Sequence, residues 1–242
     1  MLIGPQNLPE NLRAVRARIA GAAARCGRSV DSITLIGVGK AQPVELLRAA
    51  AAAGVTDLGE SYVQEALGKL EALADLPLIW HFIGQLQANK TRSIAQRFQW
   101  VHGVDRLRLA QRLAEQRPYH APPLNVCVQI NIAGESTKAG IAPDEAPALV
   151  AAIAALPRLK LRGLMCVPPA ESDPARQRRW FAEVRRVFER LNAEGAALDT
   201  LSMGMSADLE AAVLEGATMV RIGTALFGPR PARTREPNSV GA

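Results

Sequence analysis

One lysine in this sequence stands where its amine could do covalent chemistry. Only five of the 29 basic residues are lysines, and Lys40 closes the apolar run 33–39. A neutral lysine amine condenses with an aldehyde to form a Schiff base, which arginine cannot do. Partial burial or a nearby cation such as Arg221 would lower the lysine pKa from its ordinary value of ~10.4 and keep the amine neutral. Taken alone, a lysine at the end of a strand is more often a solvated charge.

Two short segments near the end of the chain combine glycines with hydroxyl side chains. Residues 202–206 read Ser-Met-Gly-Met-Ser, and residues 221–224 read Arg-Ile-Gly-Thr. Glycine lets the backbone approach a ligand closely, and hydroxyl groups donate to phosphate oxygens. Ser206 also suits the N-cap of the helix predicted after it, and a helix N-terminus is itself an anion site. The candidate phosphate-binding residues are Ser202, Gly204, Ser206, Gly223 and Thr224.

The two candidate phosphate-binding segments, 202–206 and 221–224, indicate which aldehyde Lys40 would bind. Pyridoxal 5′-phosphate is an aldehyde that carries a phosphate, so Lys40 and these segments together predict a site for that cofactor. The prediction requires a fold that brings Lys40 close to residues lying far along the chain.

The hydrophobic pattern alternates regularly between strands and helices. A helix precedes the first strand, and a helical segment follows every strand except the last. The eight predicted strands cover residues 33–39, 57–59, 78–83, 100–104, 124–132, 159–167, 200–203 and 219–226. Such alternation permits either an open doubly wound sheet or a closed (β/α)8 barrel.

The first strand-to-helix loop decides between these two architectures. An open nucleotide-binding sheet should carry G-x-G-x-x-G there, whereas residues 37–43 contain a lysine and no third glycine. We therefore predict a single (β/α)8 TIM barrel with an extra N-terminal helix over residues 1–230, followed by a disordered tail over 231–242. In such a barrel all these loops open onto one face, and the first strand neighbours the eighth. Lys40 is then expected to lie beside residues 221–224.

Composition excludes several classes of protein. The net charge of +6 comes from arginines spread over predicted helices rather than from a basic stripe with interleaved aromatics, so no nucleic-acid binding is expected. The three cysteines, Cys26, Cys127 and Cys166, lack disulfide or metal-ligand spacing and are predicted to be free thiols. The start is unlike a signal peptide, and no apolar run approaches the ~20 residues of a membrane span. We predict a cytoplasmic protein without a metal or a membrane contact.

Several long motifs of the chain occur together in one known family. They cover residues 58–65, 80–90, 129–132, 136–140, 162–165, 201–208 and 219–228. Together they resemble the signature of the YggS family, the pyridoxal-phosphate homeostasis proteins. The resemblance implies a barrel like the N-terminal domain of alanine racemase, with the cofactor bound to Lys40 as a Schiff base. It also implies a carrier or buffer of the cofactor, a monomer, with pyridoxal-phosphate-dependent apo-enzymes as partners.

The chain departs from the family pattern beside two candidate site residues. Gly39-Lys-Ala-Gln-Pro43 stands where the family usually has Ser-Lys-Thr-Lys-Pro, and Ser61 stands where it usually has asparagine. Ser61 is therefore a candidate cofactor contact with a shorter side chain. His81 is either a contact near the cofactor or a core histidine. Lys138, in the predicted loop after the fifth strand, is either a solvated charge or a second amine that receives the cofactor.

Arg221 has a role that strand alternation predicts. Its neighbours Val220 and Ile222 should face the helices, which places Arg221 inside the barrel. A buried arginine needs an acceptor, and the pyridine nitrogen of the cofactor would supply one. Because arginine only donates, that nitrogen would stay unprotonated and the ring would be a poor electron sink. The resembling racemases share this feature, so Arg221 fits both a carrier and a racemase.

Three functions remain open at this point. A carrier or buffer without strong catalytic activity is favoured over a slow racemase or transaminase, and a scaffold that needs no cofactor is the third possibility. Racemisation needs a second acid/base, which the resembling racemases supply as a tyrosine from another domain. Tyr62 and Tyr119 are the only tyrosines, and neither is expected over the cofactor.

Overall fold

Eight parallel strands close into a barrel in the computed structural model, which describes residues 7–229. Each strand pairs with its neighbours in the sequence, and β1 pairs with β8. The strands are β1 (Thr34–Val38), β2 (Asp57–Glu60), β3 (Ile79–Phe82), β4 (Trp100–Val104), β5 (Leu124–Ile130), β6 (Leu159–Cys166), β7 (Thr200–Ser202) and β8 (Met219–Ile222). The predicted (β/α)8 barrel is confirmed, whereas the predicted tail lies outside the described residues.

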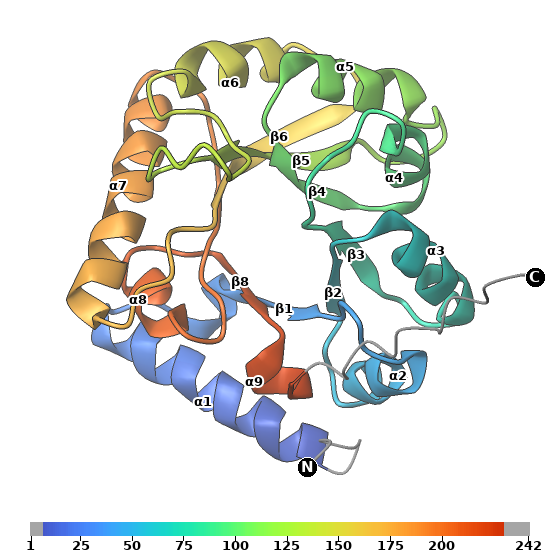
Figure 1. Cartoon of the computed structure of the whole chain (residues 1–242), viewed down its shortest axis with the longest axis vertical. Helices are drawn as coiled ribbons and strands as arrows, with labels where there is room; N and C mark the ends of the chain where they lie inside the picture. Colours follow the sequence, from blue (N-terminus) through green and yellow to red (C-terminus); the bar gives the residue numbers. More distant parts are fainter. Residues whose placement is uncertain (1–6, 230–242) are drawn as a thin grey trace, which may run out of the picture.

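Helices form a ring around the strands (Figure 1). They are α1 (Leu8–Arg25), α2 (Val44–Ala52), α3 (Val63–Ala72), α4 (Thr91–Arg97), α5 (Leu107–Gln116), α6 (Ala146–Ala154), α7 (Pro174–Ala193), α8 (Leu209–Leu214) and α9 (Thr224–Phe227), with a short 3₁₀ helix, η2 (Val30–Ser32), before β1. The main core lies between these helices and the outer faces of the strands. No helix of the part described here is long and apolar enough to cross a membrane.

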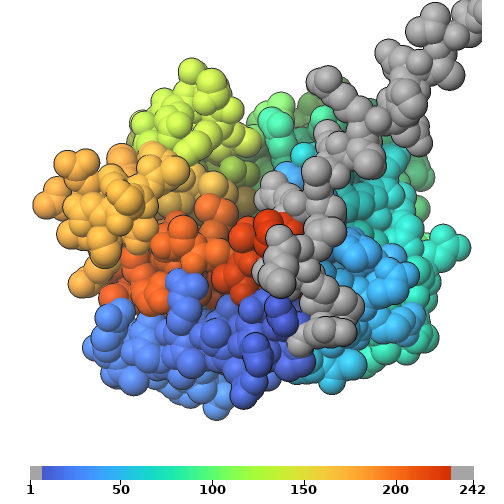
Figure 2. Space-filling view, turned by 60° about the horizontal axis from the view of Figure 1, so that its bottom comes forward, coloured from blue at the N-terminus to red at the C-terminus, as the bar shows by residue number. Residues whose placement is uncertain are grey.

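The extra N-terminal helix α1 packs across the last two helices of the chain, as Figures 1 and 2 both show. Its buried face includes Leu12, Val15 and Ile19 at helical spacing. The Nδ2 group of Asn11 donates to the carbonyl of Leu226 at 3.1 Å. The Nη2 group of Arg18 donates to the carbonyl of Ser206 at 3.0 Å. Helix α1 therefore contacts the loop that carries Ser206 and the helix α9 that follows Gly223.

The end of the barrel differs from the sequence prediction in two ways. Strand β8 stops at Ile222 rather than at residue 226, and the short helix α9 follows it. Ser206 does not cap α8, which begins after Asp208. The Oγ atom of Ser206 instead accepts from the backbone N–H of Ala225 at 3.1 Å. The physical reason is that the loop after β7 folds back over α9, so the serine meets the nearer unpaired N–H.

The inside of the barrel holds a small apolar cluster and several polar groups. The apolar part consists of Ile36, Trp100, Cys127, Met165 and Met219. All three cysteines are free, and Cys127 and Cys166 are buried as predicted. Burial raises the pKa of both buried thiols to about 12, so neither is a reactive thiolate at neutral pH.

Strands β6 and β7 approach each other so closely at Gly163 that replacing this glycine tests the structure of the barrel. A Cβ atom at Gly163 in β6 would overlap with the carbonyl oxygen of Thr200 in β7, whereas one at Gly68 in α3 would meet nothing within 4 Å. We expect Gly163→Ala to lower the free energy of unfolding by about 3 kcal/mol or more, because the strands must separate. Gly68→Ala should raise it by about 0.5–1 kcal/mol. Urea denaturation measures both changes. A Gly163→Ala variant as stable as the wild type would contradict the register of β6 with β7.

Candidate functional site

A cavity of about 360 Å³ opens at the carboxyl ends of the strands, within the usual size range of small-molecule sites. Its lining comes from the ends of β1, β2, β3, β6 and β8 and from the loop after β7. Six of the residues predicted for the site line it: Lys40, Ser61, Ser206, Arg221, Gly223 and Thr224. The structure thus brings Lys40 together with the candidate phosphate-binding segment 221–224, as barrel closure requires.

Three other predicted residues lie outside the lining of this cavity. His81 and Ser202 are fully buried inside the barrel. Gly204 is also buried, adopts a positive φ of 95°, and packs so closely against Ala212 that a side chain would not fit. Contact of these three residues with a cofactor therefore stays a prediction.

A continuous chain of hydrogen bonds crosses the barrel interior beneath the cavity. The Nη1 group of Arg221 donates to Ser202 Oγ at 2.8 Å, and Ser202 Oγ lies 2.7 Å from His102 Nδ1. His102 Nε2 lies 3.0 Å from His81 Nδ1. His81 Nε2 in turn lies 2.9 Å from Asp57 Oδ1. We call these five residues the interior chain.

The interior chain can have only one direction when Asp57 is ionised. Burial lowers the pKa of both His81 and His102, so the two rings are neutral and each has one donor and one acceptor nitrogen. An ionised carboxylate only accepts, so His81 carries its proton on Nε2 and accepts at Nδ1 from His102 Nε2–H. His102 Nδ1 then accepts from Ser202 Oγ–H, and Ser202 Oγ accepts from Arg221. Each link of the interior chain then has one donor and one acceptor, with the guanidinium of Arg221 at one end and the carboxyl group of Asp57 at the other.

Arg221 occupies the interior position that strand alternation predicted. It is 4% exposed, whereas Val220 and Ile222 belong to the core between strands and helices. Its Nη1 group also donates to the carbonyl of Ser202 at 2.6 Å, and its Nη2 group donates to the carbonyl of Cys166 at 2.8 Å. Hydrogen bonds within residues 7–229 thus use three of its five N–H groups. Burial lowers the pKa of Arg221, but arginine remains protonated in proteins.

Lys40 is half-buried at the edge of the cavity. Its Nζ atom lies 4.6 Å from the ring centroid of Tyr62, within the range of a cation–π contact. Neither tyrosine was expected over the cofactor, which stays a prediction, and the structure places the ring of Tyr62 beside the Lys40 amine. Because only two residues connect β2 to α3, Tyr62 precedes the helix and stays at the rim beside Lys40. Tyr119 is 90% exposed and stacks on Arg158 instead.

Lys138 lies outside the cavity lining. It is half-buried in the loop after β5, where its Nζ atom lies 2.8 Å from Glu135 Oε1. The loop places it on the same face of the barrel as Lys40, as expected for a segment that follows a strand. Whether Lys138 is a solvated charge or a second amine that receives the cofactor stays a prediction.

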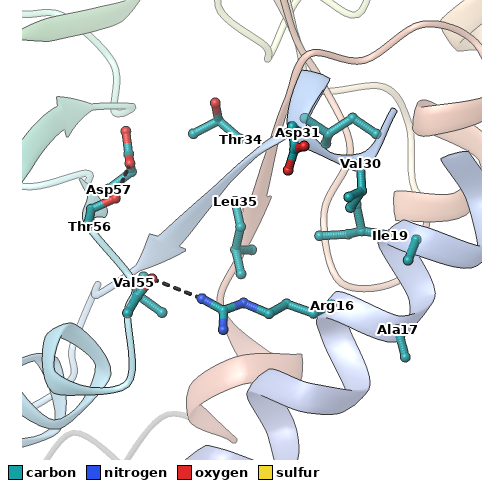
Figure 3. Close-up of a pocket in the computed structure, with 13 residues that line it drawn as sticks. Arg16, Ala17, Ile19, Val30, Asp31, Thr34, Leu35, Val55, Thr56 and Asp57 are labelled. Carbon is teal, nitrogen blue, oxygen red and sulfur yellow. Dashed lines mark hydrogen bonds between the residues drawn. The ribbon is translucent and has the colours of Figure 1, made fainter. Parts of the chain in front are cut away.

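A larger cavity of about 630 Å³ lies at the opposite, amino-terminal end of the barrel (Figure 3). It is lined by α1, η2 and the beginnings of β1 and β2, and Arg16 there donates to the carbonyl of Gly54 at 2.9 Å. None of the residues predicted for the site lines it. Since ligands of such barrels bind at the carboxyl ends of the strands, the smaller cavity is the candidate site despite its size.

Asp57, His102 and the buried carboxyl group of Glu60 were not among the residues predicted for the site. Strand alternation was the available signal for His102, because it shares a face with the interior residue Trp100. Glu60 ends β2 and is fully buried on the side of the helices, with its Oε1 atom 2.8 Å from Lys69 Nζ. Lys69 Nζ also lies 2.5 Å from Glu65 Oε1. Burial raises the pKa of Glu60 to about 7, and Lys69 opposes this shift.

The raised pKa of Glu60 gives the protein a defined pH dependence of stability. Its folded pKa of about 7 exceeds the ordinary value of 4.5, so the folded state binds this proton more tightly than the unfolded state. The stability that the proton confers is present below pH 4.5 and is lost as the pH rises through about 7. Relative to Glu60→Gln, the wild type should lose stability on the order of 3 kcal/mol between pH 5 and 8. Urea denaturation at both pH values measures this loss. If the free energies of unfolding of the wild type and of Glu60→Gln changed equally with pH, the prediction would be contradicted.

Within residues 7–229 no group of three or more histidine, cysteine, aspartate or glutamate side chains is arranged to hold a metal ion. The polar groups at the cavity are instead an amine, a guanidinium, hydroxyl groups and the backbone at Gly223. Such a set suits an organic anion that carries an electrophilic carbon and a ring acceptor.

Comparison with known proteins agrees with this architecture. The family described as "Alanine racemase, N-terminal domain" matches residues 6–231. A pyridoxal phosphate homeostasis protein from Pseudomonas aeruginosa is 56% identical over 223 residues, which is 92% of this chain and 96% of that protein. The protein of the same name from Escherichia coli K12 is 49% identical over 227 residues, which is 93% of this chain and 97% of that protein.

Solved structures extend the comparison to three dimensions. PipY of Synechococcus elongatus, without PLP, gives a TM-score of 0.81 at 36% identity and covers 91% of this chain and 100% of that one. The same protein with PLP bound gives a TM-score of 0.76 at 37% identity and covers 87% of this chain and 100% of that one. The identity, the coverage and the shared barrel lead to one conclusion: this chain belongs to the alanine racemase N-terminal domain family and, within it, to the pyridoxal phosphate homeostasis proteins.

Proposed function

We propose that this protein binds pyridoxal 5′-phosphate as a Schiff base on Lys40 and acts as a carrier or buffer in intracellular cofactor homeostasis. The observation that carries the proposal is the meeting of Lys40, Arg221 and the pair Gly223–Thr224 around one cavity. Two relatives are named as pyridoxal phosphate homeostasis proteins, and PipY has been solved with PLP bound.

The residues present fit the cofactor in three respects. Lys40 supplies an amine at the cavity edge, and Ser206, Gly223 and Thr224 supply hydroxyl and backbone groups for a phosphate. Arg221 lines the cavity, and hydrogen bonds to Ser202 and Cys166 use three of its five N–H groups. A buried guanidinium of this kind suits an acceptor supplied by a ligand.

Lys40 performs the covalent step in this proposal. When bound, the cofactor supplies an aldehyde. In the proposed step the Nζ amine of Lys40 would bond to the aldehyde carbon, and its two amine hydrogens would leave with the aldehyde oxygen as one water molecule. Addition of water reverses the step and frees the amine, which is the property that a carrier needs.

Arg221 is the proposed partner of the cofactor ring. We assign its remaining N–H groups to the ring nitrogen of the cofactor, where a permanently protonated donor leaves that nitrogen without a proton. A ring in that state is a poor electron sink, but alanine racemases share this feature, so Arg221 fits both a carrier and a racemase. Ser202 and His81 hold Arg221 in place through the interior chain, and Gly204 shapes the loop that carries Ser206. Ser61 lines the cavity beside Lys40.

The remaining parts of the proposal concern the chain as a whole. We assign residues 1–230 to one cofactor-binding barrel that acts as a monomer in the cytoplasm. Its proposed recipients are pyridoxal-phosphate-dependent apo-enzymes. The opening of the cavity at the carboxyl ends of the strands supports exchange of a small ligand with them.

A slow racemase is a second candidate function because of one observation. The ring of Tyr62 lies beside the amine of Lys40, and racemisation needs a second acid/base near the Schiff-base lysine. Chiral chromatography of common amino acids at stoichiometric protein separates the two functions. Turnover that disappears in Tyr62→Phe would favour the enzyme, whereas stable enantiomers with full cofactor binding favour the carrier.

Replacement of Lys40 tests the covalent link. Wild-type protein incubated with pyridoxal 5′-phosphate should turn yellow, and Lys40→Ala should lose the corresponding absorbance because no other amine lines the cavity within residues 7–229. Lys160→Ala, which removes an exposed lysine in β6, should keep the spectrum. A colourless wild type, or an unchanged spectrum in Lys40→Ala, would refute the proposal.

Replacement of Thr224 tests the phosphate contact. Thr224→Val keeps the shape of the side chain but removes its hydroxyl donor, so the affinity for pyridoxal 5′-phosphate should fall roughly tenfold. The affinity for pyridoxal, which lacks the phosphate, should change less than about threefold. Absorbance titration with both ligands measures the difference, and Thr137→Val, an exposed threonine outside the cavity, is the control. Equal losses for both ligands would place the phosphate elsewhere.

A further inference from the structure

An ion cluster, buried at Glu60 and Lys69 and partly exposed at Glu65, lies directly behind the turn that carries Lys40. It consists of Glu60 at the end of β2 and of Glu65 and Lys69, four residues apart on α3. The Lys69 side chain is only 6% exposed, which is unusual for a lysine. Its Nζ atom donates not only to the two carboxylates but also to the carbonyl oxygen of Gly39 at 2.7 Å. The cluster therefore reaches the backbone immediately before Lys40.

The same cluster also holds the backbone immediately after Lys40. The N–H group of Ala41 donates to Glu65 Oε1 at 2.6 Å. Ala41 has a φ of 58°, in the left-handed region that residues other than glycine rarely adopt. A charge-assisted bond from its N–H group offsets part of the strain. Peptide groups on both sides of Lys40 are thus bound to one cluster.

Gly39 allows this arrangement because it has no side chain. A Cβ atom at this position would lie 2.6 Å from Glu60 Oε1 and 2.9 Å from a methyl group of Leu47. A side chain here would have to displace Glu60 Oε1, which is the atom that contacts Lys69. A glycine at position 39 therefore leaves the space that Glu60 Oε1 occupies beside Lys69.

Stability alone does not account for the cluster. Two carboxylates share one ammonium, and Glu60 Oε2 is buried without a hydrogen-bond partner in the described part of the structure. Removing charged groups from water opposes much of their attraction, so apolar side chains of similar size often stabilise a protein equally well. What apolar side chains cannot do is bind a carbonyl on one side of Lys40 and an N–H group on the other.

We propose that Lys69, held between Glu60 and Glu65, is a positioning residue for Lys40: the cluster fixes the turn 39–41 so that the Lys40 amine faces the cavity. The inference rests on the proposed function, because it concerns the amine that would bond to the cofactor. Tyr62, Glu65 and Lys69 lie on one side of α3 and its entry, and all three contact Lys40 or its neighbours. Helix α3 thus serves as the support of the reactive lysine.

Two variants of Glu65 separate positioning from general stability. Glu65→Ala removes the acceptor for the Ala41 N–H group, whereas Glu65→Gln keeps an oxygen at that place. Lys69→Met removes the donor to Gly39. The matched control is Arg48→Met, which breaks the ion pair of Arg48 with Asp75 near the other end of α3 and does not touch the turn. Lys69→Met leaves two carboxylates without their cation and could fail to fold for that reason. In that case Glu65→Ala decides the test.

The first readout uses the protein without ligand. Amide hydrogen exchange of Ala41, followed by nuclear magnetic resonance, should accelerate at least tenfold in Glu65→Ala and remain within about threefold of the wild type in Glu65→Gln and Arg48→Met. The second readout is an absorbance titration with pyridoxal 5′-phosphate, in which the apparent affinity should fall about tenfold in Glu65→Ala and recover in Glu65→Gln.

The outcomes distinguish failure of this inference from failure of the proposed function. If the wild type binds the cofactor and folded Glu65→Ala binds it equally well, Lys69 and its partners do not position Lys40. Unchanged exchange of Ala41 in Glu65→Ala would overturn the inference even without ligand. If the wild type forms no coloured complex, the proposed function fails, and the exchange measurement still decides whether the cluster holds the turn.

Discussion

Pairing of β1 with β8 is the constraint on which the rest of the structure depends. The register places Ile36 opposite Arg221 and Gly37 opposite Ile222, so the turn at Lys40 and the loop at Gly223 emerge at the same edge. Parallel strands in an open sheet would leave these segments at opposite sides. Closure therefore creates the cavity, and helix α1 reinforces the closure by packing across α8 and α9.

The interior of this barrel is polar to an unusual degree for a packed core. Barrels of this kind are typically filled by layers of branched apolar side chains, whereas here Asp57, His81, His102, Ser202 and Arg221 cross the interior together. Burial of such groups is tolerable because each one has a hydrogen-bond partner in a single consistent direction. The result is a guanidinium that is rigidly held beneath the cavity yet retains donors for a ligand.

Strand β2 supports the candidate site from two sides. Its first residue, Asp57, points inward and ends the interior chain that holds Arg221. Its last residue, Glu60, points toward the helices and holds Lys69 behind the turn of Lys40. Side chains of a strand alternate between its two faces, so four residues suffice to reach both the floor and the flank of one cavity. The two groups proposed to contact the cofactor, the amine of Lys40 and the guanidinium of Arg221, share this short support.

The sequence by itself determined the barrel, its strand count and the residues with evident chemistry. Hydrophobic alternation is a local property, and Lys40, Arg221, Gly223 and Thr224 stand out by type and by place at strand ends. Only the tertiary structure decided which hidden groups support them. Asp57, His102, Glu60 and Lys69 look like ordinary polar residues in the sequence, and they gain their roles from partners that lie nine to a hundred positions away. The position of Tyr62 beside Lys40 and the bond of Ser206 to Ala225 were likewise unpredictable, since a loop's course depends on what it packs against rather than on its own residues.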